Sequence, residues 1–345
     1  MTVTEDEDIR AVWAARKGRS GGAAFQRRRS APPRRPVVPG ARQAPPEPPE
    51  PPEARQSIVV DPGYDLAATV GVLRRGAGDP TFRRAEDGSL WLGCRTPFGD
   101  PGTLRLRLAT AETVDAEVWG PGAAWLLKTL PDLLGLGDTE EARAEFTELV
   151  AAHGNAQLIQ SVRRNRGFRV IRSGRVWDSL VPAVLEQRVT VQEAHRAYQL
   201  LARRYGIPAP GAPADIRLCV SPSPREWALI PSWEWLRAGV DGKRSRAILG
   251  ASRVAARLEE TVGMERDEAA RRIRTVPGIG VWTAAEVMHR AHGDADAVSV
   301  GDLHLPRIVC GVLGDPAMKW DDDRMLELLE PYRGHRYRVS ALLYR

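Results

Sequence analysis

The hydrophobic pattern of the chain changes character near residue 135. Before that point, short β-branched or alternating segments are separated by turn sequences such as DPG at 61–63. The alternation of TLRLRLAT, residues 103–110, predicts a strand with a buried leucine face and outward arginines. Helical patterns occur at 65–75 and 121–135. We therefore predict a small α+β domain over residues 56–138, with strands in the segments 57–60, 89–95, 103–110 and 116–120.

From residue 139 to residue 345 the pattern is helical. Apolar residues repeat at helical spacing in 191–205, and SPRE at 223–226 matches a capping box with proline at the first helical position. Two further helical segments, 267–276 and 281–293, are separated only by PGIG. The predicted fold class is an α+β N-terminal domain followed by a mostly α-helical domain, residues 139–345. We expect its remaining tryptophans in the core, namely Trp177, Trp227, Trp233, Trp235 and Trp320.

Residues 1–55 carry a different composition. Ten basic residues and no acid lie between 10 and 42, and ten prolines lie between 32 and 52. Such a segment has too little apolar surface to offset the entropy of ordering it, so we predict a disordered tail. The tail either adds non-specific affinity for nucleic acid or is a passive extension.

Composition excludes several classes of protein. The three cysteines are far apart and form no CxxC pair, so they cannot supply the four thiolates of an iron–sulfur cluster or a structural zinc. The first residues are acidic and no apolar run approaches the length of a membrane span, so we expect a cytoplasmic protein without a membrane partner. The net charge of +6 suits a polyanionic partner.

The segment PGIG at 277–280 predicts a tight turn between two helices. Its glycines permit positive φ, and Ile279 can anchor the turn in the core. The backbone N–H groups near Gly280 and Val281 then lie at a helix N-terminus without intrahelical partners, which is a suitable site for a phosphate. A purely structural turn has the same sequence signature, because many helical hairpins use glycine.

Asp302 stands out after this hairpin. It follows the second helix by about ten residues and precedes the apolar pattern LHLPRIVCGVLG. A carboxylate at a helix start commonly caps the helix, and this interpretation competes with a chemical role. Capping alone does not explain the combination of a phosphate-binding turn with an acid at this spacing.

These motifs together resemble the helix-hairpin-helix superfamily of base-excision DNA glycosylases. PGIGxWTA followed by an aspartate is similar to its alkylpurine branch, 3-methyladenine DNA glycosylase II, although Ile273-Arg274 departs mildly from the first motif position. The resemblance covers about residues 56–345. Its other segments are GYDLAATVGVLRR at 63–75, VWDSLVPAVLEQRVTV at 176–191 and YRGHRYRVSALLYR at 332–345.

The resemblance implies a function and a set of site residues. Asp302 would stabilise an oxocarbenium-like sugar or activate water while the N-glycosidic bond is hydrolysed. Bifunctional relatives carry a lysine where this chain has Trp282, so the implied enzyme is monofunctional. Trp282 either stacks on a flipped base or packs in the core. The resemblance assigns DNA-backbone binding to Gly278, Gly280, Val281 and Thr283, and the wedge that fills the vacated stack to Gln187 and Arg188.

The substrate is less well defined by the resemblance. The alkylpurine pocket is lined by aromatics, whereas Val72, Glu286 and Leu303 occupy positions that are often aromatic there. Glu286 would be a second acid in the pocket or a solvated helix residue. We expect damaged, alkylated purines in double-stranded DNA as the substrate of a monomeric enzyme. The alternatives are a deaminated or oxidised base, or a non-catalytic DNA-binding protein. No cofactor is implied, apart from a monovalent cation that relatives hold at the hairpin carbonyls.

The tail generates the first testable prediction. Residues 1–55 hold eleven basic and seven acidic residues, which is most of the net positive charge. If the basic run contacts DNA, deleting residues 1–55 lowers non-specific affinity and flattens the plot of log K against log salt concentration. Each phosphate contact contributes a slope of about 0.9 on duplex DNA, so the loss of three contacts is measurable by titration at several salt concentrations. An unchanged slope would make the tail a passive extension.

Overall fold

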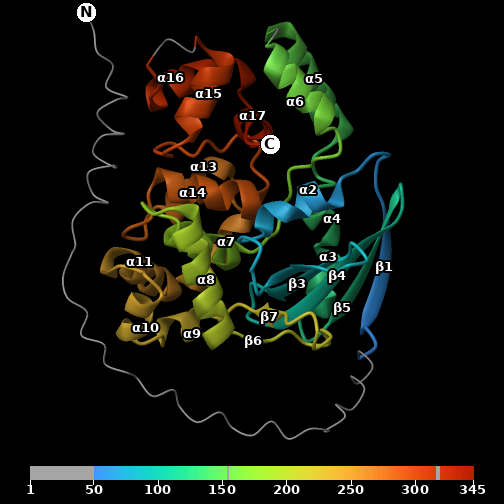
Figure 1. Cartoon of the computed structure of the whole chain (residues 1–345), viewed down its shortest axis with the longest axis vertical. Coiled ribbons are helices and arrows are strands. Elements are labelled where there is room, and N and C mark those ends of the chain that lie inside the picture. The colour runs from blue at the N-terminus through green and yellow to red at the C-terminus, as the bar shows by residue number, and fades with distance from the viewer. Residues whose placement is uncertain (1–49, 154, 316–318) are drawn as a thin grey trace, which may run out of the picture. The chain divides into compact units, whose positions relative to one another are not determined.

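The computed structural model describes residues 50–153, 155–315 and 319–345, and residues 47–345 form one compact unit. Most of the segment predicted to be disordered, residues 1–55, therefore lies outside the described residues. The first strand begins at Ala54, within the predicted tail. Within the compact unit, Figure 1 shows α3 and α4 beside the sheet, and α8 to α11 on the side of β3 that faces away from β1.

A five-stranded antiparallel sheet has the strand order β1-β5-β4-β3-β2. Leu104 lies opposite Leu92 on one side and Val118 on the other, and this cross-strand row is fully buried. The alternation that predicted the strand thus fills the core, although Leu108 is 42% exposed where the strand leaves it. The strands are β1 (Ala54–Val59), β2 (Phe82–Arg84), β3 (Leu90–Arg95), β4 (Pro101–Thr110) and β5 (Thr113–Trp119). The three-residue β2 was not predicted.

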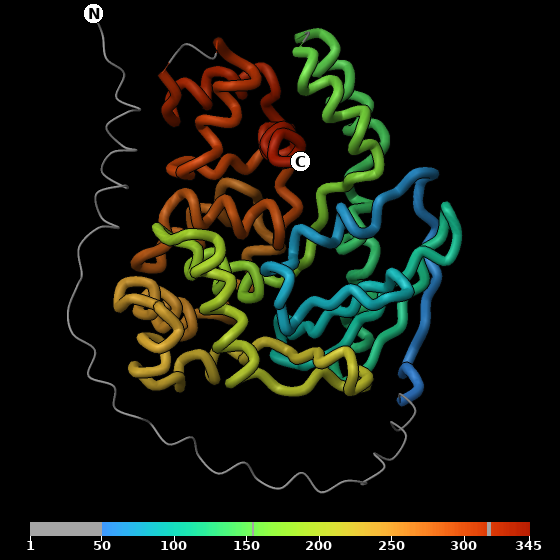
Figure 2. The backbone as a smooth tube through the Cα atoms, viewed as in Figure 1, coloured from blue at the N-terminus to red at the C-terminus, as the bar shows by residue number. Residues whose placement is uncertain are grey.

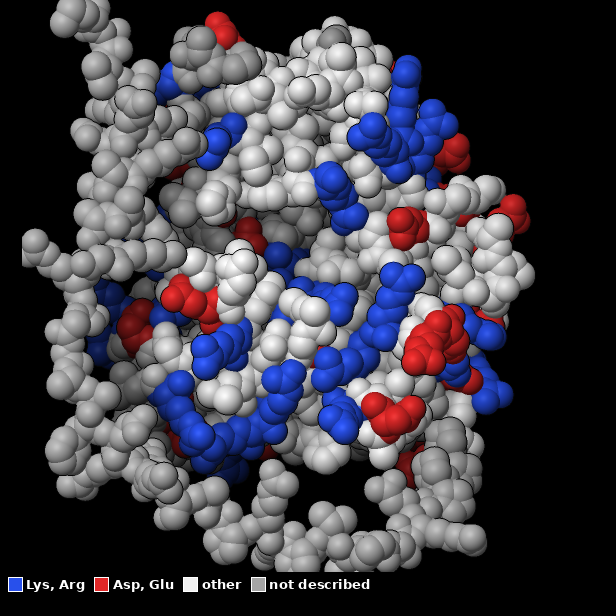
Figure 3. Space-filling model, in the orientation of Figure 1, with Lys and Arg blue, Asp and Glu red and all other residues white. Residues whose placement is uncertain are grey.

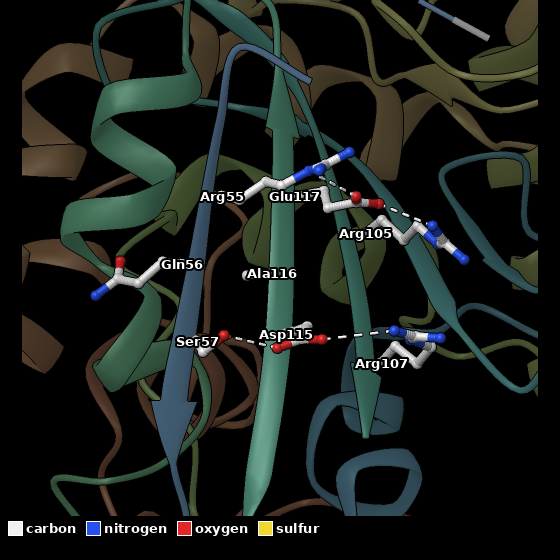
Figure 4. A pocket seen from close by; sticks show the side chains of 8 residues that line it. All are labelled: Arg55, Gln56, Ser57, Arg105, Arg107, Asp115, Ala116 and Glu117. Atoms are coloured by element: carbon white, nitrogen blue, oxygen red, sulfur yellow. Dashed lines mark hydrogen bonds and ion pairs between the residues drawn. The ribbon is translucent and has the colours of Figure 1, made fainter. Parts of the chain in front are cut away.

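The outer face of the sheet carries a ladder of ion pairs, drawn in Figure 4. Glu117 binds Arg105 at 2.8 Å and Arg55 at 3.0 Å, and Asp115 lies 3.5 Å from Arg107. These side chains line a shallow concavity of about 270 Å³. Each acid is paired with an arginine on a neighbouring strand, so these ion pairs favour the observed register of the strands. Exposed pairs of this kind contribute little to the free energy of unfolding.

Short helices cover one face of the sheet, and the rest of the unit is mostly helical apart from a two-stranded sheet. The helix predicted at 191–205 is observed with those bounds, and a capping box at Thr190 begins it. The predicted capping box at Ser223 is also present and begins the next helix, which starts at Pro224. The helices and turns near the sheet are α2 (Leu66–Val70), η1 (Gly71–Leu73), α3 (Ala123–Lys128) and α4 (Leu130–Leu133). The remaining elements are α5 (Glu140–His153), α6 (Ala156–Arg164), α7 (Val176–Leu185), α8 (Val191–Tyr205), β6 (Ile207–Pro208), β7 (Cys219–Val220), α9 (Pro224–Ala228), α10 (Ser232–Arg237), α11 (Gly242–Ser252), α12 (Ala255–Glu259), η2 (Glu260–Gly263), α13 (Arg266–Ile273), α14 (Val281–Val287), η3 (Met288–His292), α15 (Leu305–Leu313), α16 (Asp322–Leu329), η4 (Glu330–Tyr332) and α17 (Arg336–Leu343).

The helical part has two hydrophobic clusters. One surrounds α7, in which every residue except Asp178 is buried, and it contains Trp177, Trp227 and Trp235. The other joins α5 and α6 to α15, α16 and α17. The expectation that all five tryptophans are core residues was wrong for Trp233 and Trp320, which are 67% and 49% exposed.

A buried ion pair fixes the last helix, α17. Arg338 donates from both terminal nitrogens to the carboxylate of Asp138, at 2.7 and 2.6 Å, and both side chains are almost fully buried. The backbone N–H of Val170 donates to the same carboxylate at 3.1 Å. Asp138 therefore joins α17, the start of α5 and the extended segment 165–175. Figure 2 shows the C-terminal end beside α2 as a result.

The extended segment 165–175 passes close to α2. The carbonyl oxygen of Gly167 accepts the backbone N–H of Asp65 at 2.9 Å. A Cβ atom on Gly167 would lie only 2.2 Å from the carbonyl oxygen of Gly63, so this crossing requires glycine. The crossing connects the sheet side of the unit to the helical side directly.

Glu259, at the end of α12, caps the N-terminus of α7. Its two carboxylate oxygens accept the backbone N–H groups of Val176 and Trp177 at 2.9 and 2.8 Å. The N-cap residue of α7, Arg175, makes no side-chain cap bond, so the cap comes from another helix. Burial raises the pKa of Glu259 to about 7, even though the two N–H groups oppose this change.

This cap predicts a pH-dependent stability. A carboxyl with a raised pKa in the folded state holds more protons than in the unfolded state, so the free energy of unfolding falls as the pH rises from about 4.5 to about 7. Glu259→Gln removes this contribution, so the free energy of unfolding of the wild type falls by roughly 3 kcal/mol more than that of the variant across that pH window. Urea unfolding between pH 5 and 8 measures it. Glu260→Gln, which removes an exposed neighbouring carboxylate, is the control. Parallel pH curves for wild type and Glu259→Gln would contradict the prediction.

Candidate functional site

The predicted helical hairpin is present, formed by α13 and α14. Its turn buries Ile279, which is 5% exposed. Gly278 has φ +89°, and an added Cβ would lie 2.9 Å from the Cβ of Ala247. Gly280 differs, because its φ is −93° and an added Cβ would meet no atom within 4 Å. The fold therefore needs glycine at 278, whereas at 280 the absence of a side chain leaves space above the turn.

A groove of about 530 Å³ lies over this turn. It is lined by backbone and side chains of both hairpin helices, including the exposed Val281 and the arginines Arg271 and Arg274. The first-turn N–H groups of α14, including that of Val281, have no intrahelical acceptor, and no side chain caps them. The side chain of Thr283 is buried and does not line this groove, and its hydroxyl accepts a hydrogen bond from Gln187 instead.

The two predicted wedge residues have different environments in the loop between α7 and α8. Gln187 donates from its amide nitrogen to the carbonyl oxygen of Gly278 at 3.0 Å and to the hydroxyl of Thr283 at 2.8 Å. Arg188 is exposed and has φ +56°, a left-handed conformation that is uncommon outside glycine. Gln187 thus attaches the loop to the hairpin, and Arg188 is presented at its tip.

Asp302 lies just before α15 and accepts four hydrogen bonds. Its Oδ1 accepts the backbone N–H groups of His304 and Leu305, both at 2.8 Å, and the hydroxyl of Tyr344 at 3.1 Å. Its Oδ2 accepts the indole N–H of Trp282 at 2.9 Å. Asp302 is not the N-cap residue of α15, which is His304, but one of its two carboxylate oxygens accepts the first backbone N–H groups at the start of that helix.

Trp282, whose indole nitrogen lies 2.9 Å from Asp302 Oδ2, is partly buried and is not a core residue. Leu303, the residue after Asp302, is 74% exposed. Val72 is partly buried, and its carbonyl oxygen accepts a hydrogen bond from Arg290 Nε at 3.2 Å. The structure thus brings Trp282 to Asp302, leaves Leu303 on the surface and attaches Val72 to a neighbouring polar cluster.

Glu286, one turn beyond Trp282, belongs to that polar cluster. Its carboxylate accepts Arg290 at 2.6 Å and the hydroxyl of Ser299 at 2.6 Å, and it lies 3.5 Å from His289. Burial alone would raise the pKa of Glu286, but Arg290, His289 and Ser299 hold it well below its usual range. Glu286 is therefore an ion-paired, mostly buried carboxylate, which does not fit the alternative of a solvated helix residue.

His289 remains neutral within this cluster. Burial, followed by the neighbouring Arg290 guanidinium, lowers the pKa of His289 to about 4. Its ring stacks on Tyr337 with 4.1 Å between centroids. Figure 3 shows the face hollowed among α14, α17 and α2, with acidic and basic atoms both visible in the hollow. Lysine and arginine side chains gather over α8 on the same face.

Sequence reasoning missed several residues of this region. Tyr344 lies in a segment that resembled the family's closing helix, but no pattern signals its bond to Asp302, which is 42 residues away. Arg271 and Arg274 precede the hairpin turn, and their spacing of one helical turn at the end of α13 is the signal that could have identified them. No group of three or more metal-ligating side chains occurs in residues 50–153, 155–315 and 319–345.

Comparison with known proteins gives the fold. No family model matches the chain, and no curated protein matches it. Among solved structures, a 3-methyladenine DNA glycosylase from Archaeoglobus fulgidus superimposes with a TM-score of 0.69 at 18% identity, covering 84% of this chain and 97% of that one. The chain has the fold of the helix-hairpin-helix DNA glycosylases.

Two further structures agree with this fold. MBOgg1 in complex with a low-affinity DNA ligand gives a TM-score of 0.62 at 17% identity, covering 84% of this chain and 94% of that one. The 8-oxoguanine glycosylase/lyase of Clostridium acetobutylicum, in complex with double-stranded DNA containing cytosine opposite 8-oxoG, gives 0.61 at 11% identity, covering 81% and 90%. The glycosylase fold resemblance drawn from the sequence is thus confirmed. In the described residues, no helix has the length and apolar content to cross a membrane.

The contrast between the two hairpin glycines generates a prediction. Gly280→Ala weakens binding to damaged and undamaged DNA alike, by roughly tenfold, because the added methyl obstructs phosphate approach, and phosphate contacts carry no sequence information. Its thermal stability stays at the wild-type value, since the methyl meets no protein atom. Gly278→Ala instead lowers the free energy of unfolding by about 1–3 kcal/mol, because of its positive φ and the contact with Ala247.

Fluorescence anisotropy measures the affinity of the variants for damaged and undamaged DNA, and thermal unfolding measures the stability of both variants. If Gly280→Ala weakened binding only to DNA that contains a lesion, Gly280 would belong to the base pocket instead of the backbone groove.

Proposed function

We propose that the chain is a monofunctional DNA glycosylase of base-excision repair. It acts as a monomer on damaged double-stranded DNA and hydrolyses the N-glycosidic bond of damaged purines, alkylated ones foremost, after base flipping. The observation that carries this proposal is the Asp302 carboxylate, which lies on the chain that follows the hairpin and accepts the indole N–H of Trp282 at 2.9 Å. The glycosylase fold supports the same conclusion.

Asp302 performs the chemistry in this proposal. Departure of the base leaves positive charge on the sugar, and a fixed carboxylate stabilises that charge or activates the attacking water. The four donors to Asp302 are already in place, so the carboxylate does not reorganise during the reaction. An alkylated purine is itself cationic and leaves readily, so no separate general acid is required.

Monofunctional action follows from the residue at position 282. A lyase reaction requires a lysine that forms a Schiff base with the sugar, and the position that relatives use for it holds Trp282. Trp282 is partly buried with its indole N–H directed at Asp302, which leaves its ring available to contact the flipped base or its sugar.

DNA is held by the hairpin groove and the wedge loop. The free N–H groups at the start of α14, with Arg271 and Arg274, supply backbone contacts. Arg188 fills the space left by the flipped base, and its planar guanidinium can stack between bases. Because Gln187 binds Gly278 and Thr283, the wedge and the groove keep a constant separation.

A second candidate substrate is a neutral lesion, such as a deaminated or oxidised base. The observation that favours it is the polar cluster at Glu286, where Arg290 and Ser299 stand near the expected aromatic lining. Hydrogen-bonding groups there suit a base edge with donors and acceptors better than a cationic ring, which prefers aromatic faces.

Excision assays on a panel of duplexes separate these substrates. The panel contains 3-methyladenine, 7-methylguanine, hypoxanthine and 8-oxoguanine, each at the same position of one duplex. Release of the two methylated bases supports the alkylpurine proposal, whereas release of hypoxanthine or 8-oxoguanine alone supports the neutral lesion. Binding of DNA without release of any base would favour the non-catalytic DNA-binding alternative.

Asp302→Asn tests the catalytic assignment. We expect at least a hundredfold loss of single-turnover excision with almost unchanged duplex affinity, because the substitution removes the charge and keeps the shape. The asparagine oxygen still accepts the N–H groups of His304 and Leu305, so the start of α15 is retained. The matched control is Asp321→Asn, which makes the same change at the aspartate that caps α16. Retention of more than roughly a hundredth of wild-type turnover would refute the role of Asp302.

A further inference from the structure

The two carboxylate oxygens of Asp302 have unequal environments. Oδ1 accepts three donors, namely two backbone N–H groups and the Tyr344 hydroxyl, whereas Oδ2 accepts only the Trp282 indole N–H. A carboxylate oxygen offers about two lone pairs. Oδ1 is therefore saturated, and Oδ2 retains acceptor capacity for a water molecule or a developing positive charge.

Tyr344 is not held in place by burial. It is 53% exposed and lies just after α17, so hydrophobic packing does not explain its orientation. Its neighbour Arg345 donates to the carbonyl oxygen of Ala68 in α2 at 2.8 Å, and the Arg345 guanidinium lies 4.2 Å from the ring centroid of Phe168. The contacts of Arg345 on one side and the end of α17 on the other thus hold Tyr344 where its hydroxyl donates to Asp302.

The Tyr344 hydroxyl is a permanent donor. Partial burial, followed by the negative charge of Asp302 and the hydrogen bond to it, raises the pKa of Tyr344 above its usual range. The phenol consequently stays protonated throughout the working pH range and neither accepts nor releases a proton. Its contribution is geometric and electrostatic.

We propose that Tyr344 is a positioning residue that fixes the rotation of the Asp302 carboxylate, so that Oδ2 is the oxygen that acts on the sugar or on water. This inference rests on the proposed glycosylase function and adds to it a division of labour between the two oxygens. Two backbone N–H groups hold Oδ1 from the side of α15, and the Tyr344 hydroxyl holds it from the end of α17. Without that contact the carboxylate rotates more freely about its Cβ–Cγ bond.

Tyr344→Phe is the test, because it removes the hydroxyl and keeps the ring. We expect kcat to fall roughly tenfold or more while KM and duplex affinity stay at wild-type values, since the hydrogen bond acts on a charged group that does not bind undamaged DNA. In an Asp302→Asn background the same substitution has no further effect, because its partner charge is already absent. The matched control is Tyr332→Phe, a tyrosine whose ring packs edge-on against His153.

A spectroscopic readout makes the result independent of catalysis. The indole N–H resonance of Trp282, assigned by its absence in Trp282→Phe, reports the other side of the carboxylate. We expect this resonance to shift or broaden in Tyr344→Phe and to stay unchanged in Tyr332→Phe.

The outcomes separate the two proposals. A wild-type protein that releases no base from any duplex defeats the proposed function, and the indole resonance then decides whether Tyr344 holds the carboxylate. Wild-type kcat in Tyr344→Phe, or an unchanged Trp282 resonance, overturns the positioning role while leaving the glycosylase proposal intact.

Discussion

The bidentate ion pair between Arg338 and Asp138 is the constraint on which the site geometry depends. Both charges are buried, so each is stable there only because the other is present. The pair sets the position of α17, and α17 sets the position of Tyr344 and Arg345. Asp138 also receives the N–H of Val170, so the same carboxylate locates the segment that crosses beneath α2. A single pairing therefore relates the C-terminal residues to Asp302 on one side and to the sheet on the other.

The polar cluster around Glu286 differs from the aromatic pocket that the sequence motifs implied. Glu286, Arg290 and Ser299 satisfy one another, and Arg290 reaches across to the carbonyl oxygen of Val72. Such a cluster is rigid, because moving one member leaves the others without partners in a region of low dielectric. It fixes the directions of its hydrogen-bonding groups, which adaptable apolar side chains would not do.

Local features were predictable from the sequence, whereas contacts between distant segments were not. The alternation of Leu104 and Leu106, the helix at 191–205 and the glycine turn before Val281 follow from periodicity and backbone preference, which act over a few residues. The proximity of Trp282 and Asp302 was expected only through the family resemblance. The bonds from Tyr344 to Asp302 and from Gln187 to Gly278 span 42 and 91 residues and depend on how helices pack, which no local pattern encodes. Trp233 and Trp320 show the converse, because apolar character alone does not establish burial.

Three of the hydrophobic clusters, namely those around α7, under the sheet and around α15 to α17, have a consequence for folding. Asp302 leads into the cluster of α15 to α17, Trp282 belongs to the hairpin beside α7, and Ala68, which binds Arg345, lies on the helix that covers the sheet. Each cluster can form from contacts largely within its own segments, but the site exists only after all three have docked. Docking contacts between distant parts of a chain are late and slow to form, and they are also the first to open in local fluctuations. Amides near Tyr344 and Arg345 should therefore exchange their hydrogens well before those of β4, and the protein would lose its reactive geometry while most of its secondary structure persists.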